Sequence, residues 1–496
     1  MKPKILLLLI AISFLLKSTY AQTPCKEIVG YYPNWQWYDR NKLVKPTTID
    51  YSKYTIINYA FMKPTADGHI DLTDAWADEN LLLGEHDWQN GGYLPNTSLI
   101  DLAHNAGVKV LPSIGGWSLS NNFPAIAASQ AKRDTFAQAC VNLIDTYNFD
   151  GIDLDWEYPG YAPHGGSAAD KANFSLLLQA IRTAIDNYGQ AHGKTLLLTS
   201  AVSADGVKME FIDWSVASQN LDIINLMSYD FFGAFSANAN HNAPLYKPTQ
   251  GDPTFNVDSA ATKLVTKYGV DPNKITIGLA FYGRSSKTTG PAALFAATTG
   301  QTDNATFNLD DGSPTYFNVL QKMNLFTTHW DSTAHVPYLT GDGSLKTFVS
   351  YDNPQSIADK AEYIMLHQFR GAIIWEITGD YIETTPGSGV IKNTPLADTL
   401  NYVFCNSTVS INKTQVSTLN IKLYPNPTNG LIHIELLNNK EEITLIVRNV
   451  LGQQLSSTQY NSSQNFSFLI TEPKGVYFME ISTPSGKRII KKIIKY

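Results

Sequence analysis

Three carboxyl groups alternate along one short segment of the chain. Asp153, Asp155 and Glu157 lie two residues apart in the sequence DGIDLDWEYP, and the residues between them are apolar. Because successive side chains of a β-strand point to opposite faces, the three carboxyl groups should share one face. Like charges in a confined interior raise one another's pKa, and burial acts in the same direction. At least one of the three should therefore keep its proton near neutral pH.

A protonated carboxylic acid at the rim of a pocket suits the cleavage of a glycosidic bond, because the leaving oxygen must gain a proton. Glu157 is the last acid of the segment and would lie at the rim. A calcium-binding loop is one alternative, but the EF-hand pattern needs glycine and glutamate where this chain has Tyr158 and His164. An exposed acidic edge strand is the other, and the apolar opposite face argues against exposure.

Eight short apolar runs predict the strands that position these acids, and segments such as Asp134–Tyr147 and Lys171–Tyr188 between them have helical periodicity. The repeated alternation predicts an α/β fold, a (β/α)8 TIM barrel with its active site at the carboxyl ends of the strands. A doubly wound open sheet is the alternative. The runs are 28–32, 54–61, 108–114, 151–157, 196–202, 222–229, 275–282 and 371–377.

The gap between the seventh and eighth runs is too long for one helix, since long loops usually carry structure of their own. It predicts a small α+β insertion domain at about residues 285–350.

The N-terminus has the pattern of a signal peptide. Residues 1–21 place two lysines before a short apolar run and end at the small residue Ala21. The run is too short to span a bilayer, and no later stretch is long enough, so we expect no stable membrane span; an uncleaved anchor is the alternative. Cys25 and Cys405 bracket the main domain, residues 22–405, and could pair in an oxidising compartment, although buried free thiols are also compatible with three cysteines.

Composition excludes several classes of function. The 496 residues carry a net charge of −7, which makes nucleic acid an unexpected partner. The ten histidines show no metal-binding spacing, and no glycine-rich phosphate loop occurs, so neither a metal nor a cofactor is expected. Aromatic residues make up 11%, and all nine tryptophans precede residue 376. We expect many of them to line a sugar-binding cleft.

The segment DGIDLDWEYP resembles the catalytic signature of glycoside hydrolase family 18, the chitinase family. Further segments agree in chain order, namely SIGGW at 113–117, MSYD at 227–230, GLAFYGR at 278–284 and Trp375. The resemblance covers about residues 28–405. It implies a secreted chitinase that hydrolyses β-1,4 links between N-acetylglucosamine units with retention, by a mechanism in which the N-acetyl oxygen of the substrate is the nucleophile.

The resemblance also implies roles for individual residues. Glu157 would be the general acid and base, Asp155 would accept the acetamido N–H, Asp153 would share a proton with Asp155, and Tyr229 would donate to the acetamido oxygen. From its own position, one register off the inward face, we expect Asp150 to be structural, and a direct catalytic role is the alternative. The expected substrate-binding residues are Tyr31, Phe61, Ser113, Gly116, Trp117, Tyr158, Met227, Asp230, Tyr282, Arg284 and Trp375.

The expected partner is chitin or a chito-oligosaccharide. An endo-β-N-acetylglucosaminidase of glycoprotein glycans and a non-catalytic chitin-binding lectin remain as alternatives. The lectin is disfavoured because Glu157, which it would be expected to lose, is present.

A second module follows a Ser/Thr/Asn-rich linker at 406–420. Residues 421–496 predict a small β-sandwich with strands at 421–424, 431–437, 443–448, 466–470, 476–481 and 489–494. The module contains no tryptophan, which argues against a carbohydrate-binding module, the alternative. Its YPNPTNG segment at 424–430, GVY at 475–477 and basic terminal strand resemble the sorting domain of the type IX secretion system. This resemblance implies secretion or surface display, with the type IX secretion machinery as partner.

Overall fold

The computed structural model describes residues 26–309, 311–406, 420–437, 441–449, 454–461, 465–484 and 488–495. They fall into two compact units that divide between residues 407 and 408. The predicted signal peptide, Cys25 and most of the predicted linker lie outside the described residues. No helix within the described ranges is long and apolar enough to cross a membrane.

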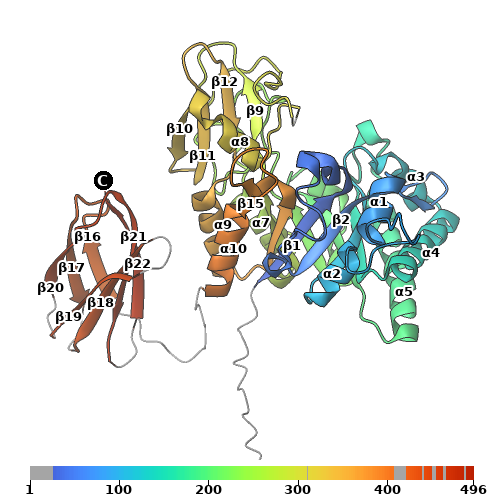
Figure 1. Ribbon diagram of the computed structural model, residues 1–496, viewed down its shortest axis with the longest axis horizontal. Coiled ribbons are helices and arrows are strands. Elements are labelled where there is room, and N and C mark those ends of the chain that lie inside the picture. The colour runs from blue at the N-terminus through green and yellow to red at the C-terminus, as the bar shows by residue number, and fades with distance from the viewer. Residues whose placement is uncertain are drawn as a thin grey trace, which may run out of the picture. The chain divides into compact units, whose positions relative to one another are not determined.

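The first unit contains a closed barrel of eight parallel strands (Figure 1). The order β1-β13-β8-β7-β6-β5-β4-β2 closes through the pairing of β1 with β2, which confirms the TIM barrel and excludes the open sheet. Each predicted apolar run overlaps one of these strands. They are β1 (Glu27–Pro33), β2 (Ile56–Pro64), β4 (Lys109–Gly115), β5 (Gly151–Asp155), β6 (Leu197–Ser203), β7 (Ile223–Met227), β8 (Ile275–Ala280) and β13 (Gly371–Trp375). The short β3 (Ile70–Asp71) pairs antiparallel with β2.

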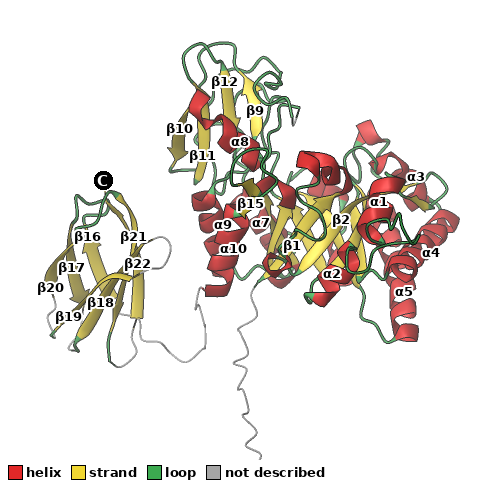
Figure 2. Cartoon of the chain, viewed as in Figure 1, coloured by secondary structure: helices red, strands yellow, loops and turns green. Residues whose placement is uncertain are grey.

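Helices surround the barrel strands on the outside (Figure 2). The α-helices are α1 (Ala75–Leu82), α2 (Leu99–Asn105), α3 (Phe123–Ala128), α4 (Gln130–Tyr147), α5 (Asp170–His192), α6 (Trp214–Asn220), α7 (Val257–Thr266), α8 (Tyr316–Lys322), α9 (Pro354–Leu366) and α10 (Pro395–Asn406). Short 3-10 helices are η1 (Asn34–Asn41), η2 (Tyr51–Lys53), η3 (Ser120–Asn122), η4 (Ala162–His164), η5 (Lys208–Phe211), η6 (Pro272–Lys274), η7 (Met323–Leu325) and η8 (Ile377–Asp380).

The apolar face of the acidic segment packs outward, as its alternation predicts. Trp156 is buried and stacks on Phe123 of α3 with ring centroids 5.4 Å apart, and Phe174 of α5 meets it edge-on at 5.8 Å. Ile152 and Leu154 belong to the same buried cluster. Burial of this face leaves the carboxyl groups on the side of the barrel interior.

The insertion lies between β8 and β13. It is a four-stranded antiparallel sheet in the order β10-β11-β12-β9, with α8 and η7 between its first two strands in the chain. The strands are β9 (Arg284–Lys287), β10 (Phe326–Asp331), β11 (Val336–Gly341) and β12 (Thr347–Ser350). After β13 the chain forms the hairpin β14 (Ile382–Glu383) and β15 (Ile391–Asn393) before α10.

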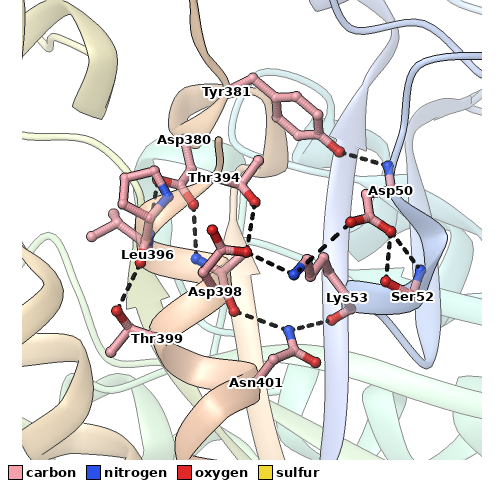
Figure 3. A network of polar contacts seen from close by, with 12 residues as sticks. Asp50, Ser52, Lys53, Asp380, Tyr381, Thr394, Leu396, Asp398, Thr399 and Asn401 are labelled. Carbon is pink, nitrogen blue, oxygen red and sulfur yellow. Dashed lines mark hydrogen bonds and ion pairs between the residues drawn. The ribbon is translucent and has the colours of Figure 1, made fainter. Parts of the chain in front are cut away.

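Polar contacts hold α10 against the start of the barrel (Figure 3). Lys53 Nζ of η2 lies 2.7 Å from an Asp398 carboxylate oxygen, and the Asn401 side chain donates to the Lys53 carbonyl oxygen at 3.1 Å. The buried Asp380 carboxylate accepts the N–H groups of Leu396 and Ala397 at the N-terminus of α10, at 3.0 and 2.7 Å. The last helix of the unit is therefore tied to both ends of the barrel sequence.

The cysteines differ in state. Cys140 is a free, buried thiol, and Cys405 at the end of α10 is disulfide-bonded. The partner predicted for Cys405 lies outside the described residues.

The second unit is a β-sandwich of two antiparallel sheets, in the orders β16-β17-β20 and β19-β18-β21-β22. Its strands are β16 (Asn420–Tyr424), β17 (Leu431–Leu437), β18 (Ile443–Asn449), β19 (Gln454–Tyr460), β20 (Asn465–Leu469), β21 (Gly475–Ser482) and β22 (Arg488–Lys495). Ile434 of β17 and Leu445 of β18 belong to one buried core that joins the sheets. The sequence predicted six of these strands and missed β19, whose QLSSTQY sequence is too polar to stand out.

Candidate active site

The three acids follow β5 from the barrel interior to its carboxyl end. Asp153 and Asp155 are buried, whereas Glu157, just past the strand, is partly exposed. Parallel pairing with β4 places Ser113 opposite Asp153 and Gly115 opposite Asp155. Depth thus increases from Glu157 to Asp153, as the position of a barrel active site at the strand ends requires.

Four side chains donate hydrogen bonds to the Asp153 carboxylate. Tyr31 and Ser113 donate to Oδ2, each at 2.8 Å, while Thr199 and Asn225 donate to Oδ1 at 2.5 and 3.1 Å. Burial raises the pKa of Asp153, and these donors lower it in part. Sequence reasoning missed Thr199 and Asn225. The only signal was the polar Asn225 within the otherwise apolar strand β7, because Thr199 is one of three hydroxyl residues in β6.

Asp155 has a different environment. Its Oδ1 is buried without a hydrogen-bond partner in the described part of the chain. Burial raises its pKa well above the ordinary value, and the neighbouring charges of Glu157 and Asp153 act in the same direction. The proposed sharing of a proton with Asp153 stays a prediction. Asp155 Oδ1 is thus an acceptor to which no described residue donates a hydrogen bond.

Glu157 is held through its backbone, and its carboxyl group also forms a hydrogen bond with the Tyr158 side chain. Its N–H donates to Ser120 Oγ at 2.8 Å, and that hydroxyl donates to the Gly116 carbonyl oxygen at 2.9 Å. Burial and the charge of Asp230 raise the pKa of Glu157 to about 7, although Tyr158 and Lys208 act in the opposite direction. A carboxylic acid with such a pKa can donate a proton near neutral pH.

Aromatic rings and one lysine lie beside Glu157. Trp117 is 53% exposed and contacts Tyr158 and His164, with ring centroids 6.5 and 4.8 Å apart. Lys208 Nζ of η5 lies 4.5 Å from the centre of the Tyr158 ring, a cation–π distance. Sequence reasoning did not single out Lys208.

Asp230, after β7, is clamped by two residues that follow β8. The guanidinium of Arg284 binds both carboxylate oxygens, at 2.7 and 2.6 Å, and the Tyr282 hydroxyl donates to one of them. Tyr229 meets Tyr282 edge-on at 6.1 Å, and the charges of Asp155, Asp230 and Glu157 contribute to its strongly raised pKa, after burial and Tyr282. Tyr229 therefore stays protonated and can donate a hydrogen bond near the acids.

Aromatic side chains from the neighbouring strands β1, β2 and β13 form a cluster that we call the aromatic floor. Trp375, at the end of β13, stacks on Phe61 at 5.6 Å with an angle of 18° between the rings, and contacts Tyr31 at 5.7 Å. Phe61 lies at a β-bulge between Ala60 and Met62, which points it out of the regular pleat. Met227 packs against the same cluster.

The tryptophans occupy several different environments. Trp35 contacts Phe61 and Trp375, so it extends the aromatic floor. Trp156 and Trp214 are buried in the core. Trp76 and Trp88 form an exposed cluster with His86, and none of the ring contacts among the described residues joins this cluster to Trp375. The compositional excess therefore serves several purposes.

Asp150 lies at the opposite end of β5 from Glu157. Its carboxylate lies 2.8 Å from His104 Nε2 and accepts the Val110 N–H at 2.7 Å, which ties α2 and β4 to the start of β5. These contacts give it a structural environment outside the group of site residues.

The structure therefore places all the predicted site residues at or beneath one end of the barrel. A partly exposed acid with a pKa near 7 lies above a buried acid with a free oxygen, beside an aromatic floor. Such an arrangement can protonate a leaving oxygen and bind the apolar face of a sugar ring.

Comparison with known proteins agrees with this chemistry. The family model for glycosyl hydrolases family 18 matches residues 27–380, and the model for a secretion system C-terminal sorting domain matches residues 422–496. Chitinase A1 of Niallia circulans is 34% identical over 430 residues, which cover 77% of this chain and 60% of that protein. Chitinase 1 of Aphanocladium album is 34% identical over 356 residues, which cover 70% of this chain and 80% of that protein. The structure of a Bacillus thuringiensis chitinase matches with a TM-score of 0.67 and 27% identity, covering 95% of this chain and 85% of that one.

Proposed function

The chain belongs to glycosyl hydrolases family 18, and we propose that it is a secreted chitinase that hydrolyses β-1,4 links between N-acetylglucosamine units. The observation that carries the proposal is the state of Glu157. This acid is partly exposed, it lies above Asp155, and its own pKa is raised to about 7. The relatives named chitinases support the substrate class.

The reaction has two steps. Glu157 protonates the glycosidic oxygen. At the same time the acetamido oxygen of the sugar that carries the anomeric carbon attacks that carbon, which breaks the glycosidic bond and forms an oxazolinium ion. Glu157, now a carboxylate, removes a proton from water, which attacks the same carbon and reopens the ring, so configuration is retained.

Three further residues assist Glu157 in this scheme. The unpartnered oxygen of Asp155 accepts the acetamido N–H, and its negative charge stabilises the oxazolinium cation. The Tyr229 hydroxyl donates a hydrogen bond to the acetamido oxygen and orients this oxygen for attack. Asp153, held by its four donors, keeps Asp155 and the strand in place and exchanges a proton with Asp155.

The substrate lies across the aromatic floor. Trp375 supports the sugar ring that reacts, and Phe61 and Tyr31 pack against Trp375. Asp230, which Arg284 and Tyr282 hold in place, binds sugar hydroxyls. Tyr158 and the exposed Trp117 extend the binding surface on the Glu157 side, and Met227 contributes to the pocket wall. Ser113 and Gly116 act by shaping the strand beneath.

The C-terminal domain directs the chain to secretion or to the cell surface. We propose that the type IX secretion machinery reads this domain, residues 421–496, after the signal peptide at 1–21 has started export. In this division the catalytic domain is residues 22–405 and the linker is 406–420. An enzyme delivered outside the cell would meet chitin or chito-oligosaccharides directly.

Glu157→Gln tests the proposal, because the amide keeps the shape of the side chain and cannot donate a proton in the same way. We expect the rate of hydrolysis of N-acetylglucosamine oligomers to fall by at least about a hundredfold. Binding of the oligomers, measured by tryptophan fluorescence, should persist. Glu383→Gln, in the β14–β15 hairpin, is the matched control. Residual turnover near that of the unchanged enzyme would overturn the assignment of Glu157.

Substrate assays separate the two alternatives. A chitin-binding lectin would bind oligomers without releasing products. An endo-β-N-acetylglucosaminidase would release glycans from glycoproteins and leave N-acetylglucosamine oligomers intact.

A further inference from the structure

Asp230 has a backbone conformation that needs support. Its φ of +58° is left-handed, a region that non-glycine residues adopt at a cost. The Asp230 N–H donates to Asn242 Oδ1 at 2.9 Å, and the N–H of the next residue, Phe231, donates to the Asn242 carbonyl oxygen at 3.0 Å. One residue, 12 positions further along the chain, thus binds both N–H groups at this turn.

Asn242 is itself held by the insertion domain. It is buried, and its N–H donates to Ser350 Oγ of β12 at 2.7 Å. Ser350 is the register partner of Arg284 in the pairing of β12 with β9. Arg284 binds the Asp230 carboxylate, so one pair of neighbouring residues in the insertion sheet supports both the backbone and the side chain of Asp230.

The residue before Asn242 adds a second attachment. His241 is fully buried, and its Nε2 lies 2.9 Å from Asp331 Oδ2 at the end of β10. The other oxygen of Asp331 accepts the N–H groups of Thr333 and Ala334, and the Ala334 carbonyl oxygen accepts the Leu245 N–H at 2.9 Å. The loop at 241–245 is therefore fixed to the insertion sheet.

We propose that Asn242 is a positioning residue for the reaction, through which the insertion domain holds Asp230 at the cleft. The proposal rests on the proposed function, since Asp230 acts there on the substrate. It gives the insertion domain a role in the reaction, because its sheet sets the backbone conformation of a substrate-binding residue in the barrel.

Displacement of Asp230 has a consequence that general loosening of the fold does not share. The charge of Asp230 raises the pKa of Glu157. The other groups that act on Glu157 are Asp155, which is linked to it by charge, and Tyr158 and Lys208, which lower its pKa. Tyr229 also faces these acids but stays uncharged. If Asp230 moves away, the pKa of Glu157 falls, and the alkaline limb of the pH–rate profile moves to lower pH.

The test uses the full chain with Asn242→Ala, which removes the acceptor for the Asp230 N–H. We expect KM for N-acetylglucosamine oligomers to rise about tenfold, the worth of one lost hydrogen bond, and the alkaline limb to move to lower pH. Ser350→Ala removes the support one step away and should change both quantities in the same direction by a smaller amount, whereas Ser350→Thr keeps the hydroxyl and should preserve both. Ser286→Ala, a buried serine of β9 in the same sheet, is the matched control.

The outcomes are distinguishable. An unchanged KM and an unchanged alkaline limb in both Asn242→Ala and Ser350→Ala would overturn the proposal. The proposal would also be overturned if the loss of rate in these variants only matched their loss of folded protein, measured by thermal unfolding, and the pH profile stayed unchanged. If Asn242→Ala does not fold, Ser350→Ala with its threonine rescue decides the question alone. Failure of the proposed function would appear elsewhere, as full activity of Glu157→Gln.

Discussion

Gly116 lies directly beneath the aromatic floor, and its replacement by alanine gives a sharp test of how the cleft is built. A Cβ at this position would lie 2.6, 2.8 and 2.9 Å from three ring carbons of Phe61. The φ of Gly116 is +86°, so a side chain here also meets backbone strain. Phe61 stacks on Trp375, so any displacement of its ring passes to the floor of the cleft.

The size of the effect follows from the contact distances. Carbon atoms pack best at about 3.5 to 4.0 Å, so the Phe61 ring must move by roughly 1 Å or more to accept the new methyl group. Overpacking of this kind costs about 1 to 3 kcal/mol, and left-handed strain adds about 1 to 2 kcal/mol. A misplacement of about 1 Å at a catalytic site can reduce the rate by about a hundredfold.

We therefore expect Gly116→Ala to reduce kcat/KM for N-acetylglucosamine oligomers by about a hundredfold and to lower the melting temperature. Gly107→Ala is the matched control, because Gly107 has a φ of +77° with no atom within 4 Å of the added Cβ. It isolates the strain from the clash and should leave kcat/KM unchanged. Wild-type kcat/KM in Gly116→Ala, or an equal loss in Gly107→Ala, would refute the reasoning.

Three further predictions follow from charged groups. Because Glu157 must be protonated to start the reaction and its pKa is about 7, kcat/KM should fall about tenfold per unit as pH rises above 7, measured on a soluble oligomer; a flat profile to pH 9 would contradict this. Lys208→Met removes a cation that lowers the pKa of Glu157, so the same limb should move to higher pH, and a move to lower pH would contradict the assignment. Lys360→Met leaves the buried Asp352 carboxylate without its ion pair and should lower the free energy of unfolding in urea by about 3 to 5 kcal/mol. The double variant Lys360→Met/Asp352→Asn should recover part of this loss, and a loss below about 1 kcal/mol in the single variant would contradict the prediction.

The barrel was predictable because its signals are local. Each strand buried on both faces reads as an apolar run, and the alternation from Asp153 to Glu157 fixes which side chains share a face. The insertion followed from a gap too long for one helix. The strand β19 was missed because the QLSSTQY segment has no apolar pattern and is defined only by its pairing with β18.

The surroundings of the acids were less predictable, because they come from distant segments. Thr199 and Asn225 meet Asp153 across 46 and 72 positions, and Lys208 reaches Tyr158 from a short helix after β6. No short pattern marks such residues, since each is defined only when the barrel closes. The left-handed turn at Asp230 and its support by Asn242 belong to the same class.

The seam where the first and last barrel strands meet cannot form until most of the chain has been made. The first strand, β1, pairs with β13, and next to this seam Lys26 Nζ donates to the Phe369 carbonyl oxygen across 343 positions. At a synthesis rate of about 5 to 20 residues per second, the first strand waits roughly 17 to 70 s for its partner. Contacts of such long range also form slowly, because loop closure comes before the gain from pairing. We expect the barrel to stay open until β13 has been made, an interval in which the chain can still be threaded through a membrane.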